Sequence, residues 1–214
     1  MRTLYHYAHS PFSRRTRLAL AHKGLDCELR EGRSDPGVLG EARRLAPFRT
    51  IPVLVDEGRA MGDSVAISHW LDVAYPDAPR LWPEGEDALA ALQTAALVDV
   101  ALNHVIDVGT RYYPLRESAA WAGVTQEMLG RARLALDALA ERTASLGRPT
   151  VARSGWSAAD MWICTMVAWF EGMPARAQGN QNVTQILTLG ITMPPALVAW
   201  ARPHRERPDV RALG

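Results

Sequence analysis

The stretch "HSPFSRR" at positions 9–15 places a hydroxyl side chain where a helix is expected to begin. Ser10 directly precedes Pro11, and proline suits the first helical position, so Ser10 is the natural N-cap. In one interpretation the hydroxyl only satisfies a helix amide, which stabilises by about 1 kcal/mol, and Ser13 can share that task. In the other, the partial positive charge of the helix N-terminus and the hydroxyl together stabilise an anion such as a thiolate.

The thiolate interpretation is energetically reasonable. A thiol with a pKa of about 8.5 is only about 3% ionised at pH 7. Lowering its pKa by about two units makes it mostly ionised and requires that the thiolate be stabilised by about 2.7 kcal/mol. A charge-assisted hydrogen bond beside a helix end can supply that amount. The protein would then contribute no nucleophile and would activate a thiol that arrives with a cofactor. The residues around Ser10 favour neither interpretation over the other.

A second group of residues lies at the start of the apolar run "TIPVLVD". Pro52 follows the β-branched Ile51 at a strand start, where a cis peptide bond is plausible. Such a turn leaves backbone groups of Val53 free to pair with an extended peptide. This segment therefore predicts a place where a peptide ligand can add to a sheet.

A third group, Gly62-Asp63-Ser64, opens a helical pattern. Ser64 can cap that helix, and its amide and hydroxyl suit a carboxylate, while Asp63 suits an ammonium group. Together the two residues could hold an amino-acid group. Simple helix capping explains the same pair, because Asp-Ser before a helix is common.

Other chemistry-bearing residues predict no site. Cys27 and Cys164 match no metal or redox spacing and are expected to be inert thiols in a reducing cytoplasm. His6 and His9 have no further ligand types nearby, so we expect no metal site. The cationic residues of the first helix are expected to be surface charges, with Arg17 paired internally: Arg14, Arg15 and Arg17.

Composition sets the class of protein. The 214 residues are 48% hydrophobic and 22% charged, which is typical of a soluble globular protein. A net charge of +1 gives no reason to expect nucleic acid as a partner. The chain has no run of about 18 apolar residues and no secretion signal, so we expect no membrane-spanning helix and a cytoplasmic protein.

The predicted secondary structure changes along the chain, from mixed strands and helices to helices alone. The first 75 or so residues alternate between strand and helix patterns in the order β-α-β-α-β-β-α, with segments at 2–7, 11–22, 25–30, 36–45, 50–56, 60–61 and up to 74. The stretch "YPDAPRLWPEGED" is rich in proline and predicts a linker. Beyond it the patterns are helical, and 176–195 is expected to be a loop with one helical turn.

With these motifs in place, the chain resembles the cytosolic glutathione transferases over nearly its whole length. The resemblance is carried by "SPFSRRTRLALAHKGLDCE", "APFRTIPVLVD" and "GDSVAISHWLDVAYPDAPRL", which fall in order at suitable spacing. It implies an α/β thioredoxin-like domain at 1–76, a linker at 77–87 and an all-α C-terminal domain at 88–214. A capping box is also expected near 157–160, from Ser157 and Asp160, with Trp156 and Met161 at the positions of a hydrophobic staple.

The resemblance also implies roles for individual residues. Ser10 matches the thiol-activating serine, and Asp63 with Ser64 matches the contacts to the γ-glutamyl unit of glutathione. Val53, next to Ile51 and the cis-proline at Pro52, matches the backbone contact to the cysteinyl unit. Arg49 stands where many members have a lysine or glutamine near the glycine end, although the context "PFRT" differs from the common pattern.

Alternatives remain open at the thiol. Some branches of the family use a tyrosine at the end of the first strand, so Tyr5 and Tyr7 are rivals of Ser10, as is Ser13. His9 could also contact the thiol region. The flanking residues fit the serine-type branches better, and the combined motifs are similar to those of bacterial β-aryl etherases.

The predicted function is a serine-type glutathione transferase. Glutathione would be the co-substrate, the partner would be a small apolar or aromatic electrophile, and the family implies a homodimer. Aromatic residues of the C-terminal domain supply apolar surface for the electrophile: Tyr112, Tyr113, Trp121, Trp169 and Phe170. The rival is a non-catalytic interaction module of the same fold. A disulfide reductase is a poor candidate because neither end of "SPFS" can form a mixed disulfide.

Overall fold

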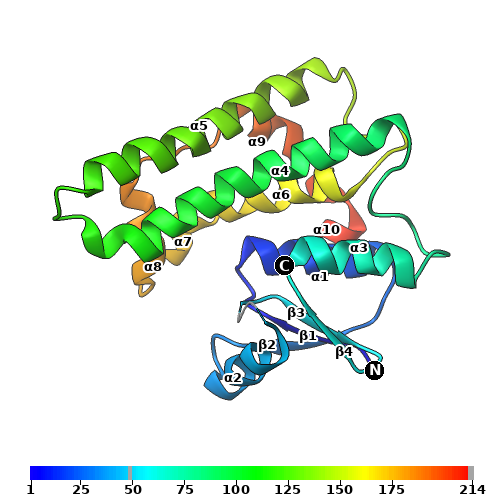
Figure 1. The fold of residues 1–214 in the computed structure, drawn as a ribbon. Coiled ribbons are helices and arrows are strands. Elements are labelled where there is room, and N and C mark those ends of the chain that lie inside the picture. The colour runs from blue at the N-terminus through cyan, green and yellow to red at the C-terminus, as the bar shows by residue number, and fades with distance from the viewer. Residues whose placement is uncertain (48–49, 212–214) are drawn as a thin grey trace.

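The computed structural model of the chain describes residues 1–47 and 50–211. Figure 1 shows four layers: helix α2 beneath a sheet, helices α1 and α3 above it, and a bundle of helices above those. The N-terminal domain contains β1 (Thr3–His6), α1 (Pro11–His22), β2 (Glu28–Glu31), α2 (Pro36–Leu45), β3 (Val53–Asp56), β4 (Arg59–Gly62) and α3 (Ser64–Ala74).

The four strands form one mixed sheet in the order β2-β1-β3-β4. Strand β1 pairs in parallel with β2 and antiparallel with β3, which in turn pairs antiparallel with β4. The element order and this sheet confirm the predicted thioredoxin-like α/β domain. Side chains alternate across the sheet: Leu4 and Leu54 face the large core, whereas Tyr5 and Val53 face α2.

Strand β2 starts later than the alternation of apolar residues predicts. The amide of Leu25 donates to the carbonyl of Leu20 at 3.0 Å, and that of Gly24 donates to Ala21 at 3.0 Å. Gly24 has a φ of +66°, so these bonds form a closing turn at the end of α1. The Leu25 amide therefore caps the C-terminal end of α1, and the strand begins only at Glu28.

The C-terminal domain is helical, as predicted. Its elements are α4 (Glu86–Asp107), the turns η1 (Val108–Tyr112) and η2 (Tyr113–Leu115), α5 (Trp121–Ser145), α6 (Ala158–Glu171), α7 (Met173–Arg176), α8 (Gln181–Thr188), α9 (Pro195–Ala201), η3 (Arg202–Glu206) and α10 (Pro208–Arg211). Helices α4 and α5 run side by side with α6 behind them (Figure 1). Nearly every side chain of α6 is buried, and α6 also packs on α1, which joins the two domains.

The predicted capping box is present at the start of α6. The carboxylate of Asp160 accepts the amide of Ser157 at 2.8 Å and its hydroxyl at 2.7 Å. The same carboxylate accepts the amide of Val151 at 2.7 Å, and its burial raises the pKa of Asp160 to about 6. This box therefore fixes both the helix and the loop before it.

The segment 176–195 contains more helix than expected. Helix α8 begins at the N-cap Asn180, whose side chain accepts the amide of Val183 at 3.3 Å. Val183 and Ile186 are buried on one face. The asparagine, glutamine and threonine residues around them have weak helix propensity, so the sequence under-predicts a helix that packing stabilises.

One helix bears on the expectation that no segment spans a membrane. The segment Glu86–Leu115 is 30 residues long and has the length and composition that could cross a membrane. Its alanine, valine and leucine content raises the mean hydropathy although no long unbroken apolar run is present. In the fold, 39% of its most apolar window is buried, and α4 packs on α5 and α6 as a core helix does.

Candidate active site

Ser10 is the N-cap of α1, as predicted. Its backbone is extended, with φ −68° and ψ 129°, and its hydroxyl oxygen accepts the amide of Ser13 at 3.4 Å. That distance is at the long end for a hydrogen bond, and the hydroxyl proton is not used by it. Ser10 is half-buried and lines a cavity of about 200 Å³ between the domains, together with Phe12 and Trp169.

Of the three rivals of Ser10 as the thiol-contacting residue, only Tyr7 lines the same cavity among the described residues. Ser13 is fully buried, and its hydroxyl oxygen accepts the amide of Tyr7 at 3.2 Å, so it faces the protein interior. Tyr5 points to the other side of the sheet, where its hydroxyl donates to Glu41 at 2.6 Å. Tyr7 is half-buried and does line the cavity beside Ser10. Ser10 and Tyr7 are thus brought together, whereas Ser13 and Tyr5 are not.

The segment with the predicted cis-proline lines a second cavity of about 460 Å³. The Ile51–Pro52 peptide bond is cis, as expected, and both residues border this cavity. Val53 is buried at the first position of β3, opposite Tyr5 in β1. Arg49 lies outside the described residues.

Asp63, rather than Ser64, is the N-cap of α3. Its carboxylate accepts the amides of Val65 at 2.9 Å and Ala66 at 3.0 Å. Asp63 has a φ of +72°, which is uncommon for a residue with a Cβ atom, and such strained conformations recur at active sites and ligand-binding sites. The residue is exposed and borders the second cavity together with Ser64, so both residues of the pair line one cavity.

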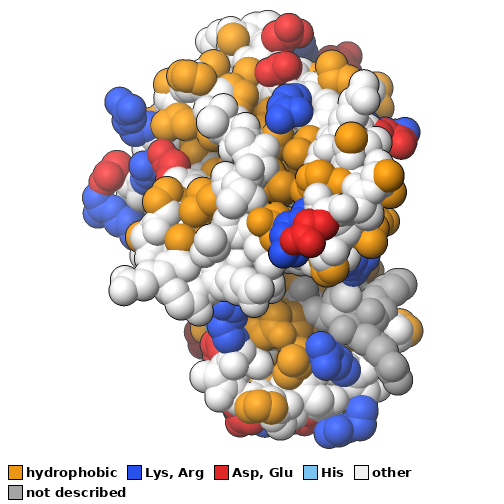
Figure 2. Space-filling view, turned by 90° about the vertical axis from the view of Figure 1, so that its left-hand side faces the viewer, with side chains coloured by type: hydrophobic (Ala, Val, Ile, Leu, Met, Phe, Trp, Pro, Cys, Tyr) orange, Lys and Arg blue, Asp and Glu red, His pale blue; other side chains and the backbone are white. Residues whose placement is uncertain are grey.

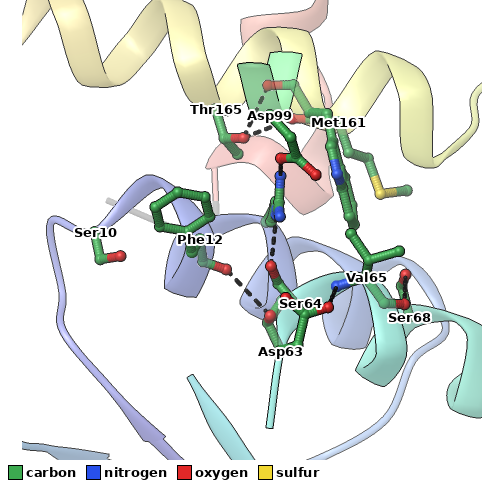
Figure 3. A network of polar contacts seen from close by, with 12 residues as sticks. Ser10, Phe12, Asp63, Ser64, Val65, Ser68, Asp99, Met161 and Thr165 are labelled. Atoms are coloured by element: carbon green, nitrogen blue, oxygen red, sulfur yellow. Dashed lines mark hydrogen bonds and ion pairs between the residues drawn. The ribbon is translucent and has the colours of Figure 1, made fainter. Parts of the chain in front are cut away.

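Ser64 is held by Arg15, a residue expected from the sequence to be a surface charge. Arg15 is 1% exposed, and its Nε donates to the Ser64 hydroxyl oxygen at 2.8 Å. Its Nη1 forms an ion pair with Asp99 of α4. Figure 3 shows this network between α4 above and α3 below, with Ser10 standing apart on the other side of Phe12.

The aromatic surroundings of Arg15 complete its burial. Its guanidinium carbon lies 4.9 Å from the ring centroid of Phe12 and 4.4 Å from that of Trp162. Burial lowers the pKa of Arg15, and the charge of Asp99 acts in the opposite direction. Arg15 precedes the buried Leu18 and Ala19 by three and four residues, so helical spacing already placed it on the core face. That spacing was the signal that could have identified it.

The other arginines of α1 are half-buried. The Nη2 of Arg17 donates to the carbonyl of Ala8 at 2.9 Å, which agrees with the expected internal partner. Arg14 also has interactions within the protein. The first helix therefore turns its arginines largely inward.

The two cavities adjoin. Tyr7, Phe12 and Ile106 line both of them, so the Ser10 end and the Asp63–Ser64 end belong to one groove. Figure 2 shows a hollow between the two domains with apolar side chains exposed in it and cationic side chains on either side. An elongated ligand could place an anionic sulfur near Ser10 and an amino-acid group near Asp63 and Ser64.

The groove holds no thiol of the protein within the described ranges. Burial raises the pKa of the Cys27 thiol to about 11 and also raises that of Cys164. Across residues 1–47 and 50–211 there is no group of three or more metal-ligating side chains. Of the aromatic residues expected to face an electrophile, Trp169 lines the cavity at Ser10, whereas Tyr113 and Trp121 border a separate groove.

Two comparisons relate this sequence to known proteins. The family model for the glutathione S-transferase N-terminal domain matches residues 4–79. The chain is 33% identical over 201 residues to "Probable glutathione S-transferase GSTU1" of Oryza sativa subsp. japonica, a match that covers 90% of this chain and 80% of the rice protein.

Solved structures share the fold. The crystal structure of rice GST1 (OsGSTU1) in complex with glutathione matches with a TM-score of 0.66 and 28% identity, covering 99% of this chain and 89% of that one. A glutathione S-transferase from Methylobacillus flagellatus, with glutathione bound, matches with a TM-score of 0.76 and 21% identity, covering 100% and 99% of the two chains. The matched N-terminal domain, the identity shared along most of the rice protein and the common fold show that this chain belongs to the glutathione S-transferase family.

Proposed function

We propose that this protein is a serine-type glutathione transferase that uses Ser10 to stabilise the thiolate of bound glutathione. The thiolate sulfur would form a bond with an electrophilic carbon of a small apolar or aromatic substrate. In a displacement reaction the leaving group departs with the electron pair of the broken bond. The thiol proton is lost to solvent when glutathione ionises.

One observation carries this proposal. The hydroxyl of Ser10, at the N-terminus of α1, opens into a cavity that adjoins the cavity bordered by Asp63 and Ser64. A helix N-terminus and a hydroxyl donor favour an anion at one end. A carboxylate and a hydroxyl favour an amino-acid group at the other. Glutathione presents both chemistries, with a thiol in the middle and a γ-glutamyl group at one end.

The remaining contacts to glutathione are assigned along the same groove. Asp63 would accept the ammonium group, and the amide and hydroxyl of Ser64 would donate to the adjacent carboxylate. Arg15 supports this role, because its Nε already occupies the oxygen of the Ser64 hydroxyl as a donor and leaves the hydroxyl proton for a ligand. Val53, after the cis-proline, would pair with the cysteinyl backbone, and Arg49 is proposed for the glycine end.

The electrophile would occupy the cavity beside Ser10. Phe12 and Trp169 provide aromatic surface there, and Val183 with Ile186 provides aliphatic surface from α8. A β-aryl ether is one electrophile of suitable chemistry, with an aryloxide as the leaving group. We also propose that the protein works as a cytoplasmic homodimer, as the family implies.

Glutathione-dependent turnover of a chlorinated nitroarene, an isothiocyanate and a β-aryl ether by the purified protein tests this function. We expect turnover of at least one of them above the uncatalysed rate, and a loss of about 10² in kcat when Ser10 is replaced by alanine. Turnover that is unchanged in Ser10→Ala would move the thiol-stabilising role to Tyr7.

The rival function is a non-catalytic interaction module. The exposed Asp63 has a backbone conformation that is uncommon for a residue with a Cβ atom and borders the groove, which supports a binding role there over a pure scaffold. Calorimetric titration with glutathione separates the two functions. No binding at about millimolar glutathione would mean a binding free energy weaker than about −4 kcal/mol, and it would favour the interaction module.

A further inference from the structure

The cavity beside Ser10 combines an apolar floor with an excess of positive charge. Arg33 and Arg176 line it together with His9, and Glu31 is the acidic residue among its lining residues. Cationic side chains flank the apolar hollow on the face shown in Figure 2. A purely apolar electrophile would make no use of these charges.

Arg176 is a preorganised cation. It lies at the end of α7 and donates through Nε to the carbonyl of Gly172 at 2.8 Å, through Nη1 to that of His9 at 3.3 Å, and through Nη2 to that of Trp169. These acceptors are neutral, and no ion pair of Arg176 is present within the described part of the chain. A guanidinium has five N–H donors, so two of them remain for a ligand.

Arg33 supplies a second cation from the opposite domain. It follows β2, is exposed, and its guanidinium carbon lies 5.8 Å from the ring centroid of Tyr7. Among residues 1–47 and 50–211 its side chain forms no ion pair. Arg33 and Arg176 therefore approach the cavity from different domains without an acidic partner.

Glu31 offsets one of the two positive charges in the lining, but it forms no ion pair with either arginine among the described residues. Its Oε1 accepts the amide of Ala8 at 3.2 Å, and its Oε2 accepts the amides of Arg33 at 2.7 Å and Ser34 at 2.9 Å. The hydroxyl of Ser34 donates to the same Oε2 at 3.1 Å. Backbone donors thus occupy both carboxylate oxygens, and the carboxylate serves to shape the loop.

His9 lies within the positive field of these arginines. Burial lowers the pKa of His9, and so do the charges of Arg176, Arg14, Arg33 and Arg17, in that order. The positive potential at the cavity comes from arginines whose charge does not depend on pH near physiological pH.

We propose that the second substrate of this enzyme carries a carboxylate, which Arg176 and Arg33 bind while its apolar part packs on Phe12 and Trp169. This inference rests on the proposed glutathione transferase function and names the substrate class of that site. The class is a small aryl or alkyl acid with an electrophilic carbon. Displacement forms the carbon–sulfur bond and releases the leaving group with its electron pair, so the acid group itself is unchanged.

A matched pair of electrophiles tests this proposal. We choose 4-chloro-3,5-dinitrobenzoate and its methyl ester, because both lose chloride to a thiolate and differ in the charge at the far end of the ring. Each rate is divided by the uncatalysed rate with glutathione. We expect the wild-type enzyme to favour the acid by about tenfold or more in kcat/KM, as expected for a charge-assisted contact.

Single-residue variants test whether Arg33 and Arg176 bind the carboxylate. Arg33→Gln and Arg176→Gln are each expected to lower the acid-to-ester ratio of kcat/KM by about tenfold. Arg131→Gln removes the same charge from the exposed face of α5, outside both cavities, and is expected to leave the ratio unchanged. Arg176 also bonds to carbonyls at the end of α6, so its variant is checked by thermal unfolding, whereas the exposed Arg33 carries no such risk.

The outcomes separate this inference from the function on which it rests. Equal losses for acid and ester in both variants, with a raised pKa of bound glutathione, would mean that the arginines act on the thiolate, and would overturn the inference. Turnover of the ester with no preference for the acid would overturn it as well. Absence of both glutathione binding and turnover of the ester would overturn the proposed function and the inference together.

Discussion

The two ends of the groove hold their serines in opposite ways. Ser10 is half-buried and its hydroxyl accepts a long hydrogen bond, at 3.4 Å from the Ser13 amide, whereas Ser64 is 1% exposed and its hydroxyl lies 2.8 Å from the Arg15 Nε. A loosely bonded hydroxyl can reorient toward a ligand whose charge changes during a reaction. A firmly held hydroxyl suits a part of the ligand whose charge does not change during the reaction. The difference supports the proposal that the reaction takes place at the Ser10 end and that the Ser64 end anchors the ligand.

The largest effect is expected at the anchoring end. Arg15→Met should lower the free energy of unfolding by about 3 kcal/mol, because Asp99 then loses its partner at the contact between the domains. The estimate lies at the low end for a buried pair because the Asp99 side chain is 25% exposed. Denaturant unfolding measures it.

The double variant Arg15→Met/Asp99→Leu is the control. It removes both charges and should recover part of the loss, since no unpaired charge remains. A loss below about 1 kcal/mol for Arg15→Met would mean that the pair behaves like a surface ion pair and does not join the domains.

The next effect is expected at the chemical end. Ser10→Ala should lower kcat by about 10², or about 2.7 kcal/mol, while the KM for glutathione changes little. Because the hydrogen bond from the Ser13 amide to Ser10 is long, we expect Ser10→Ala to lower the free energy of unfolding by less than about 1 kcal/mol. Steady-state kinetics at saturating electrophile give the separation of kcat from KM. A rise in KM with an unchanged kcat would make Ser10 another anchoring residue.

Asp63→Asn sharpens the anchoring role without breaking the helix. The amide oxygen of asparagine can still cap α3 and tolerates a positive φ, but it carries no charge for an ammonium group. We expect the KM for glutathione to rise about fivefold to tenfold, or about 1 kcal/mol, with a similar melting temperature. A melting temperature that falls with no change in KM would reduce Asp63 to a helix cap.

The smallest effect is expected for Ser13→Ala, the matched control for Ser10→Ala. The buried Ser13 accepts the Tyr7 amide, so its loss should cost about 1 kcal/mol of stability and leave kcat within about twofold. Thermal unfolding and kinetics of both variants are compared side by side. A reversed pattern, with kcat falling in Ser13→Ala alone, would exchange the roles of the two serines.

The local features of the N-terminal domain could be predicted from short patterns. Ser10 before Pro11 indicated the start of α1, and "IPV" indicated the cis bond, because each signal depends on a few neighbouring residues. The capping box at Ser157 and Asp160 was predictable for the same reason.

Features that depend on distant partners were missed. Arg15 was interpreted as a surface charge because its acidic partner, Asp99, is 84 residues away in the sequence. Helix α8 is stabilised by the burial of Val183 and Ile186 against other elements, which its polar composition hides. The cationic cavity likewise depends on the fold, which brings Arg33 of one domain and Arg176 of the other to the lining of the same cavity.

The pKa of bound glutathione tests the central claim most directly. Ultraviolet absorbance of the thiolate, followed through a pH titration, measures it in the wild-type protein and in Ser10→Ala. We predict a pKa of about 6.5 in the wild type and a return toward about 8.5 in the variant. A pKa that stays low without the Ser10 hydroxyl would contradict the account.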